Sequence, residues 1–345
     1  MNKIQLALVL VNYNNSNDTI ESFIKAKKSR LSNVEISYFI VDNGSSENEK
    51  NILHEFALSF CSAENNLRNL SFSTPDIPVI HNEKINRNLI GKYNFLFLRN
   101  NLGFSAGNNA ILQLGSDTNL FSLFLLLNTD CFVFKNTIQR IVDRYIIASC
   151  TFPLQKIGPI GGTLYYPGDG FKIQAIAGGK INKFLYNSEH YFYKKSINPK
   201  MISEIYDPDF ITGALMLMSK HLIKDIGLLN ADFFLYQEDK EYCLRARNYG
   251  YKLFHAPMAI AIHKEGGSKK SSYYSYYYST RNNFYIIKIF AMKFVGLRIF
   301  CYFLFNFLSS FLVRRDYIHI KISIIAFYHF ILNRMGKVSN DFWKV

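Results

Sequence analysis

The chain has 345 residues, enough for one large domain with an appended region or for two modest domains with real cores. Hydrophobic residues make up 49% and charged residues 19%, a composition that argues against both a disordered chain and a polytopic membrane protein. The net charge of +14 favours binding of nucleotides, nucleic acid or an anionic membrane surface. The sequence contains no Lys/Arg block, RNA-binding aromatic signature or zinc-finger spacing, so nucleic acid is not an expected partner.

Cysteine usage and the first residues bear on the compartment. The five cysteines are odd in number, far apart and never in a C-x-x-C pair, which argues against a disulfide framework and a thiolate metal site and favours a reducing compartment. The apolar run at residues 6–11 starts almost at once and lacks the long apolar core and cleavage site of a signal peptide. We therefore interpret it as a first strand.

The first 135 residues alternate between apolar strands and helical stretches. The expected strands lie at residues 6–11, 36–41, 95–98 and 120–127. One helix is expected at 18–28, and the polar segment 99–109 is expected to turn into a second helix that ends at 113. Alternation of this kind predicts a mostly parallel sheet with helices on both faces. Residues 61–92 lose the pattern and are interpreted as an insertion on the domain surface.

Polar segments follow each of these four strands, at residues 12–14, 42–45, 99–109 and 128–130. The carboxyl ends of parallel strands meet at one edge of a sheet, where ligands of such folds bind. The sequence therefore predicts that four segments far apart in the chain surround one crevice.

The second half of the chain is richer in turns. It is expected to hold a strand at 210–218 that leads into a helix at 220–226, and a helix at 240–249 that ends at Gly250. A strand follows at 252–263, with Pro257 at an edge or a bend.

From about residue 281 the chain changes to apolar stretches spaced by Lys and Arg. The longest uncharged run, 299–313, would span roughly 22 Å as a helix, which is short of the roughly 30 Å hydrocarbon core of a bilayer. Alternating aromatic and basic residues favour amphipathic helices that lie on a membrane surface. The alternative is a helical hairpin packed on the catalytic domain or on a partner chain. A tyrosine-rich stretch at 273–278 precedes this region and would either stack on a ligand or cover a surface.

Several residues at the predicted crevice could act on a nucleotide. Neither G-x-G-x-x-G nor a P-loop is present, so a nucleotide would be held in another way. Asp42 could accept hydrogen bonds from a base or ribose, and Gly103 and Gly107 would let the backbone approach a ligand, although each alone could be a turn or cap residue. Asp130 ends a buried strand and could bind a divalent cation with diphosphate oxygens, water or His263.

Glu238 and Asp239 precede an amphipathic helix, and helix capping explains one of them. Two adjacent acids point in different directions, so the other could face the crevice and act as a general base. The sequence has no G-x-S-x-G, which disfavours serine hydrolases of that type.

Taken together, the motifs resemble the family 2 glycosyltransferases with the GT-A fold, and most closely the rhamnosyltransferase-like enzymes of O-antigen and cell-wall polysaccharide synthesis. The resemblance covers roughly residues 4 to 290. The motifs that carry it are Val11-Asn-Tyr-Asn14, Val41-Asp-Asn-Gly-Ser-Ser46, Asn101-Leu-Gly-Phe-Ser-Ala-Gly-Asn-Asn109, Leu127-Asn-Thr-Asp130, Thr212-Gly-Ala, Phe233-Phe-Leu-Tyr-Gln-Glu-Asp239 and Cys243-Leu-Arg-Ala-Arg247.

The resemblance implies a role for each matching residue. Asp239 would be the catalytic base with Glu238 beside it, and Asp130 would hold Mg²⁺ or Mn²⁺ on the diphosphate, with His263 as a possible further ligand. The acceptor would border Gly213 and Ala214. The residues implied in donor binding are Asn12, Tyr13, Asp42, Asn43, Gly103, Phe104, Gly107, Asn108, Asn128 and Lys264. Residues 263–268 resemble a loop that closes over the donor. The aspartate-any-aspartate motif of many GT-A enzymes is Asn128-Thr-Asp130 here, which makes metal dependence less secure than the fold.

The resemblance thus implies an inverting glycosyltransferase of the hexosyltransferase type. It would move a sugar, with rhamnose as the first candidate, from a dTDP- or UDP-linked donor to a glycan or lipid-linked acceptor in bacterial surface polysaccharide synthesis. The expected organisation is a GT-A domain at 1–280, with a nucleotide half at 1–135 and an acceptor half at 136–280, and a helical region at 281–345 peripheral to the cytoplasmic face of the membrane. The alternatives are a non-catalytic nucleotide-sugar-binding or scaffold protein and a nucleotidyltransferase.

Overall fold

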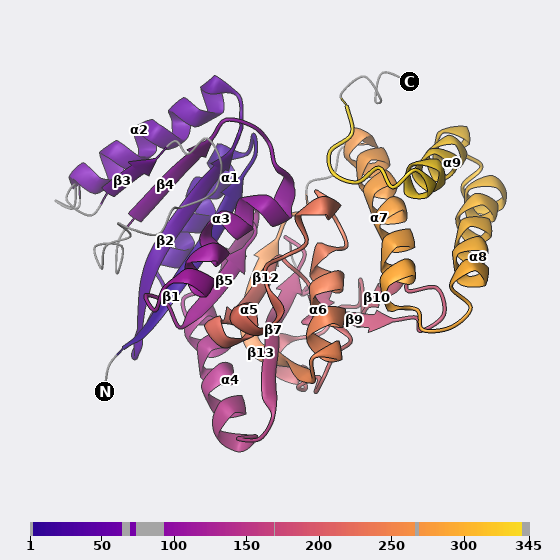
Figure 1. Ribbon diagram of the computed structural model, residues 1–345. Helices are drawn as coiled ribbons and strands as arrows, with labels where there is room; N and C mark the ends of the chain where they lie inside the picture. Colours follow the sequence, from indigo (N-terminus) through magenta and orange to yellow (C-terminus); the bar gives the residue numbers. More distant parts are fainter. Residues whose placement is uncertain (1–2, 64–69, 74–92, 169, 266–268, 340–345) are drawn as a thin grey trace.

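The computed structural model describes residues 3–63, 70–73, 93–168, 170–265 and 269–339. One continuous sheet runs through the molecule, and its N-terminal half is parallel (Figure 1). Its strands are β1 (Ile4–Asn12), β2 (Val34–Asn43), β3 (Leu70–Ser73), β4 (Tyr93–Leu98) and β5 (Leu123–Leu127). β1 lies between β5 and β2, and both faces are covered, which explains why these strands are almost continuously apolar.

The second half of the sheet is mixed. β12 (Leu215–Ser219) runs antiparallel to β5 and to β7 (Lys156–Tyr165), and a meander of β8 (Ile173–Ile176), β9 (Gly178–Ile181) and β10 (Ser188–His190) continues the sheet beyond β7. The short β11 (Phe210–Ile211) pairs with β9. β13 (Tyr251–His263) runs parallel to β7 and antiparallel to β6 (Cys131–Val133), and its register shifts between His255 and Ile260, so the bend expected at Pro257 is present.

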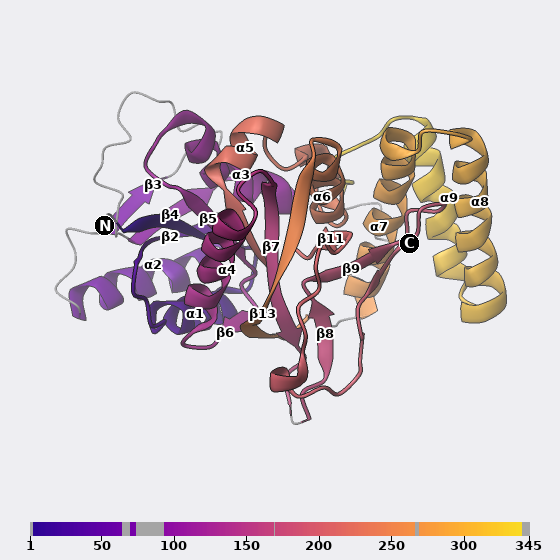
Figure 2. The same ribbon diagram turned by 90° about the horizontal axis from the view of Figure 1, so that it is seen from below.

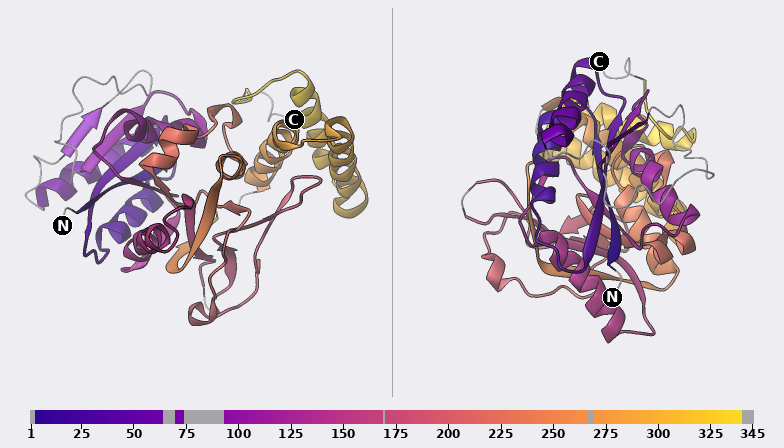
Figure 3. Two further views of the ribbon diagram at one scale, coloured as in Figure 1. Left: turned by 60° about the horizontal axis from the view of Figure 1, so that its bottom comes forward. Right: turned by 90° about the vertical axis from the view of Figure 1, so that its left-hand side faces the viewer.

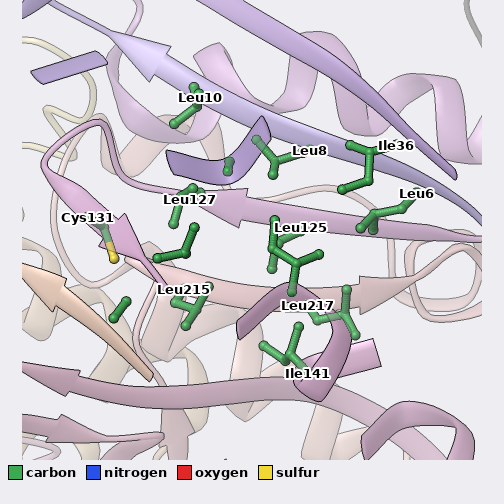
Figure 4. Close-up of a cluster of buried hydrophobic side chains, with 14 of the residues drawn as sticks. Leu6, Leu8, Leu10, Ile36, Leu125, Leu127, Cys131, Ile141, Leu215 and Leu217 are labelled. Atoms are coloured by element: carbon green, nitrogen blue, oxygen red, sulfur yellow. The ribbon is translucent and has the colours of Figure 1, made fainter. Parts of the chain in front are cut away.

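Helices cover both faces of the sheet (Figure 2). α1 (Ser16–Lys27), α2 (Glu47–Ala63) and α4 (Thr137–Thr151) pack on one face, and α3 (Gly103–Asp117), α5 (Lys220–Ile226) and α6 (Glu238–Asn248) on the other. Figure 4 shows leucines of β1, β5 and β12 meeting Ile141 of α4 in the first of these cores. Each such side chain contributes about 1.5–3 kcal/mol through burial. The expected α/β class is confirmed.

The chain ends in a separate layer of helices beside the C-terminal half of the sheet (Figure 3). It consists of α7 (Lys269–Phe290), α8 (Val295–Leu308), the π-helical turn η5 (Ser309–Arg314) and α9 (Tyr317–Ile331). Among the described residues, the 3₁₀ turns η3 (Pro199–Met201) and η4 (Ala231–Phe233) lie earlier in the chain. The domain boundary expected at residue 280 falls inside α7, which is one continuous helix.

The helical layer carries a long apolar stretch. Within the described residues, one segment, Val295–Leu312, is long and apolar enough to cross a membrane by length and composition, and only 17% of it is buried. It is longer than the uncharged run that the sequence suggested, because it begins four residues earlier, at Val295, and includes Arg298.

The tyrosine-rich stretch packs largely within the helical layer, with Tyr273, Tyr274 and Tyr276 partly exposed. It lies in α7 and faces α8, η5 and α9: the Tyr276 hydroxyl lies 3.4 Å from Asn306 Oδ1 of α8, 3.1 Å from Ser310 Oγ of η5 and 2.9 Å from Ser323 Oγ of α9. Tyr277 and Tyr278 are buried in the same layer. These aromatics therefore attach α7 to the helices that follow it.

The segment at residues 61–92 contributes two described pieces. Residues 61–63 complete α2, and Leu70–Ser73 form the edge strand β3, which pairs with β4. The rest of the expected insertion lies outside the described residues, as do residues 266–268 of the loop expected to close over a donor.

Candidate active site

A cavity of about 970 Å³ lies over the carboxyl end of β5 and the antiparallel half of the sheet. Asp130 and Asp239 both line it. The expectation that these two carboxylates share one crevice is therefore met, although 109 residues separate them in sequence. The other predicted residues that line the cavity are Phe104, Asn128, Gly213, Ala214, Glu238 and His263.

At one end of the cavity, His263 faces the carboxylate of Asp130. The distance from His263 Nε2 to Asp130 Oδ1 is 3.1 Å, and His263 Nδ1 lies 2.6 Å from Gln174 Oε1. Gln174 donates its amide hydrogen to Glu265 Oε2 at 3.1 Å, so its oxygen faces the imidazole. An oxygen can only accept, so Nδ1 carries the hydrogen. In the neutral ring, Nε2 then presents its lone pair to Asp130.

Two acceptors that face each other at this distance need a positive charge between them. Either a proton, which would make His263 an imidazolium, or a cation bound by both side chains supplies it. The amide nitrogen of Asn128 also faces His263 Nε2, at 3.4 Å. That amide nitrogen can only donate a hydrogen, so the groups that could bind a divalent cation in this orientation are the Asp130 carboxylate and the His263 imidazole. Among the described residues no group of three or more His, Cys, Asp and Glu side chains gathers to hold a metal, so diphosphate and water would complete the coordination.

At the other end, Asp239 accepts two backbone hydrogen bonds. Gly213 N donates to Oδ2 at 3.0 Å and Lys240 N to Oδ1 at 2.7 Å. The strand expected at 210–218 is in fact broken into β11 and β12 by Thr212, Gly213 and Ala214, and this break turns the Gly213 amide toward the carboxylate. A Cβ at position 213 would lie 3.1 Å from the end of the Phe104 ring, a tight contact that favours glycine there.

The two adjacent acids differ in their environments. Glu238 is 6% exposed, and its Oε2 has no hydrogen-bond partner in the described chain. Burial, with a smaller contribution from the charge of Asp239, raises the Glu238 pKa to about 8. Burial also raises the pKa of Asp239, but its two backbone donors oppose that shift by stabilising the carboxylate. Near neutral pH we expect Glu238 to keep its proton, while Asp239 is the better base.

The loop at residues 233–237 presents this pair to the cavity, and it is strained. Phe234, Tyr236 and Gln237 have φ values of 62°, 64° and 75°, in the left-handed region that side chains disfavour. Phe104 N donates to Phe234 O at 2.7 Å. Gly103, with φ 87°, lies so close that a Cβ there would be 2.1 Å from Phe234 O. Gly103 and Phe104 thus hold the loop.

Most of the predicted donor-binding residues do not line the cavity. Asn12 donates to Asp42 Oδ1 at 2.8 Å, and Asn43 donates to Gly103 O at 2.9 Å while accepting from Leu102 N at 3.0 Å. These buried contacts order the loops after β1, β2 and β4. The described residues that were predicted to bind the donor but lie outside the cavity lining are Asn12, Tyr13, Asp42, Asn43, Gly103, Gly107, Asn108 and Lys264.

Three of these residues have other evident contacts. Gly107 lets α3 approach β1, since a Cβ there would be 2.7 Å from Val11 Cγ1. Asn108 is buried and donates to Phe104 O at 2.9 Å. Lys264 binds Asp18 of α1, with Nζ 2.6 Å from Oδ1, and this hydrogen bond raises its pKa. Tyr13, by contrast, is 48% exposed.

The sequence reasoning missed the side chains that β8, β9 and the hairpin to β10 bring to the cavity. They are Gln174, Lys180, Glu189, His190, Tyr191, Phe192, Tyr193 and Lys195. His190 lies close enough to Asp239 to oppose, in part, the rise that burial causes in the Asp239 pKa. No motif marks this segment, although its density of aromatic and basic residues could have suggested a binding surface.

Comparisons with known proteins bear on the activity of this cavity. The family profile described as "Glycosyl transferase family group 2" matches residues 173–335, which include the hairpin, the acid pair and the helical layer. The chain is 25% identical over 265 residues to the low-salt glycan biosynthesis hexosyltransferase Agl10 of Haloferax volcanii, a match that covers 75% of this chain and 67% of that protein. The chain is a glycosyltransferase, and its second half is similar to family group 2.

Solved structures support the GT-A fold of this glycosyltransferase. GalNAc-T7, whose structure contains UDP, GalNAc and Mn²⁺, superposes with a TM-score of 0.57 at 14% identity, covering 96% of this chain and 57% of that one. The mannosyltransferase PcManGT of Pyrobaculum calidifontis, solved with GDP-Man and Mn²⁺, superposes with a TM-score of 0.52 at 10% identity, covering 96% and 88%. At these identities the likeness establishes the fold alone. The rhamnosyltransferase-like branch stays a prediction.

Proposed function

We propose that this glycosyltransferase moves a hexose from a nucleoside-diphosphate sugar to a hydroxyl of a glycan or lipid-linked acceptor, with inversion at the anomeric carbon. The observation that supports it is one cavity with a cation-binding pair at one end and a buried carboxylate at the other. Such a cavity can hold the diphosphate and the attacking hydroxyl at once.

In the proposed reaction Asp239 accepts the proton of the acceptor hydroxyl as that oxygen attacks the anomeric carbon. The bond from this carbon to the diphosphate oxygen breaks on the opposite face, and the nucleoside diphosphate leaves. The Gly213 and Lys240 amides keep the carboxylate oriented throughout. Asp130 and His263 would hold Mg²⁺ or Mn²⁺, which stabilises the charge that develops on the leaving diphosphate.

The donor sugar is proposed more broadly than the motif resemblance suggested. dTDP-rhamnose and UDP-hexoses remain candidates from that resemblance, and GDP-mannose joins them because PcManGT was solved with it. Agl10, named a hexosyltransferase of glycan biosynthesis, supports a hexose and a glycan-building role. Lys180 and Lys195 in the cavity lining supply the positive charge that Lys264, bound to Asp18, was expected to provide.

We further propose that the enzyme works at the cytoplasmic face of the membrane, held there by its helical layer. Phe300, Phe311 and Leu312 are each 57–60% exposed along one helical stretch, and Lys293, Arg298 and Lys321 lie nearby in sequence. Apolar side chains with basic neighbours suit an anionic lipid surface. The purified chain should float with vesicles of anionic lipid. Recovery of all the protein in the soluble fraction would refute membrane binding.

A donor screen tests the activity. The purified chain is incubated with dTDP-rhamnose, UDP-hexoses and GDP-mannose, with Mn²⁺ or with EDTA, and with short glycan or lipid-linked acceptors, and released nucleoside diphosphate is measured. We expect one donor class to give metal-dependent release that rises on addition of an acceptor. Donor binding without any release would favour the non-catalytic scaffold, and pyrophosphate release from a nucleoside triphosphate would favour a nucleotidyltransferase.

A further inference from the structure

Three consecutive residues of α7, Arg281, Asn282 and Asn283, are fully buried and directed at the segment that carries the catalytic acids. They lie in the helical layer, outside the sheet that defines the fold. None of them lines the cavity. Their contacts are with the residues on both sides of Asp239.

Asn282 binds the strained loop that precedes the acid pair. Its amide nitrogen donates to three backbone carbonyls of that loop, at 2.9 Å to Phe233 O, 3.0 Å to Leu235 O and 2.8 Å to Tyr236 O. A loop with left-handed residues has a cost of order 1–3 kcal/mol for each and persists only where its surroundings fix it. Asn282 supplies that constraint.

Arg281 reinforces the same contact. Its guanidinium donates to Phe233 O at 3.2 Å and to Asn282 Oδ1 at 2.9 Å, and it lies 4.9 Å from the centre of the Tyr278 ring. Its hydrogen-bond acceptors within the described chain are neutral oxygens, Gly336 O among them. Burial of a guanidinium without a carboxylate partner is costly, which argues for a role beyond packing.

Asn283 holds the residue that follows Asp239. Its Oδ1 accepts from Lys240 Nζ at 2.7 Å, and its amide donates to Leu185 O at 2.9 Å. Lys240 Nζ also donates to Tyr186 O at 2.6 Å, so the turn of the β9–β10 hairpin is bound to the same point. α7 therefore fixes the loop before the base, the lysine after it and the hairpin that borders the cavity.

We propose that Arg281, Asn282 and Asn283 are positioning residues for Asp239, and that the helical layer is thereby part of the catalytic machinery. This inference rests on the proposed role of Asp239 as the base. If it holds, loosening α7 changes catalysis without changing any residue that touches a substrate.

The test compares Asn282→Leu, similar in volume but without a donor, with Tyr276→Phe on the same helix, whose hydroxyl contacts Asn306 of α8, Ser310 of η5 and Ser323 of α9. A base displaced by a small distance loses about tenfold or more in rate, so we expect kcat of Asn282→Leu to fall at least that far while donor KM stays within about twofold. Tyr276→Phe should lower Tm and leave kcat unchanged. Asn282→Ser, which keeps one donor, should be intermediate and replaces the leucine variant if that one does not fold.

The pH profile separates positioning from a loss of stability. The titratable groups that face Asp239 are Glu238, Lys240 and Cys243 on α6 and His190 on β10, and none of them changes in these variants. Release of the loop admits water, which relieves the burial that raises the Asp239 pKa. The acid limb of kcat should therefore move to lower pH in Asn282→Leu and stay in place in Tyr276→Phe.

Amide hydrogen exchange gives a readout that does not need turnover. Exchange across residues 233–240 should accelerate in Asn282→Leu and remain as in the parent protein in Tyr276→Phe. Unchanged exchange in the Asn282 variants, or an equal loss of kcat in the Tyr276 control, overturns the inference. If the parent protein transfers no sugar, the proposed function fails, whereas the exchange experiment still decides whether α7 fixes the acid segment.

Discussion

The two ends of the cavity use the same kind of side chain for opposite purposes. Asp130 faces an imidazole lone pair and its side chain is 19% exposed, so it attracts a cation. Asp239 lies against backbone amides beside a buried, protonated Glu238, so it is arranged to take up a proton. The partners of each carboxylate decide its chemistry, and the variants below test that division in order of decreasing effect on activity.

The largest effect is expected at the proton-accepting end. Asp239→Asn keeps the shape of the side chain but cannot accept the proton, so kcat should fall about 1,000-fold. Donor affinity in Mn²⁺, measured by titration calorimetry, should stay within about twofold because the cation end is untouched. Substantial transfer by the Asn variant would show that another group is the base.

The cation end should show the reverse pattern. Asp130→Ala is expected to weaken Mn²⁺-dependent binding of the donor about 100-fold, and Gln174→Ala, which releases the His263 ring, about tenfold. Calorimetry with Mn²⁺ and with EDTA measures both. Donor binding that is equally strong in EDTA would mean that the Asp130–His263 pair is held by a proton instead of a metal.

Gly103→Ala tests whether the close contact of Gly103 with the 233–237 loop holds the catalytic acids in place. Its Cβ would meet Phe234 O, so we expect the free energy of unfolding to fall by about 1–3 kcal/mol and kcat to fall about tenfold as the loop shifts. Gly250→Ala is the matched control, because its φ of 82° is close to the 87° of Gly103 but nothing lies within 4 Å of its Cβ. If both variants lost the same stability and the same kcat, backbone strain alone would explain the effect of Gly103→Ala, and the contact with Phe234 O would not.

The smallest effect on activity is expected for Glu238→Gln, which mimics the protonated acid. The pKa of Glu238 is about 8 in the folded protein against an ordinary 4.5, so the folded state binds the extra proton between these values. The free energy by which this proton stabilises the folded state is therefore fully present below pH 4.5 and is lost as pH rises through 8. The variant lacks this loss, so its Tm should exceed that of the parent by about 3 °C at pH 8 and by little at pH 5.

Much of the sheet could be predicted, since its signals are local. Apolar runs such as Leu6–Val11 give parallel strands, because strands covered on both faces need apolar side chains throughout. The polar residues after β5 and before α6 were correctly placed at one cavity, because strand direction fixes which end of the sheet they occupy. The break at Gly213 was missed, because the residues on both sides of it are apolar and read as one strand.

The donor residues were harder to place for a different reason. Asn12, Asp42 and Asn43 have the polarity of ligand-binding residues, but in the structure they bind one another and Gly103. A sequence does not show whether a buried amide will find its partner within the protein or in a ligand. The hairpin to β10 was missed because its side chains reach the cavity through strand pairings that no local pattern records.

By itself, the amino-acid sequence determined the parallel strands β1, β2, β4 and β5, the helices α1, α3, α5 and α6, the end of the sheet at which the chemistry lies, and the two carboxylates at Asp130 and Asp239. Tertiary structure alone decided which of the polar residues face the cavity, which acid of the adjacent pair keeps its proton, and that α7 holds the segment around the base. Periodicity is a property of neighbours along the chain, whereas burial and hydrogen-bond partners arise from residues up to hundreds of positions apart.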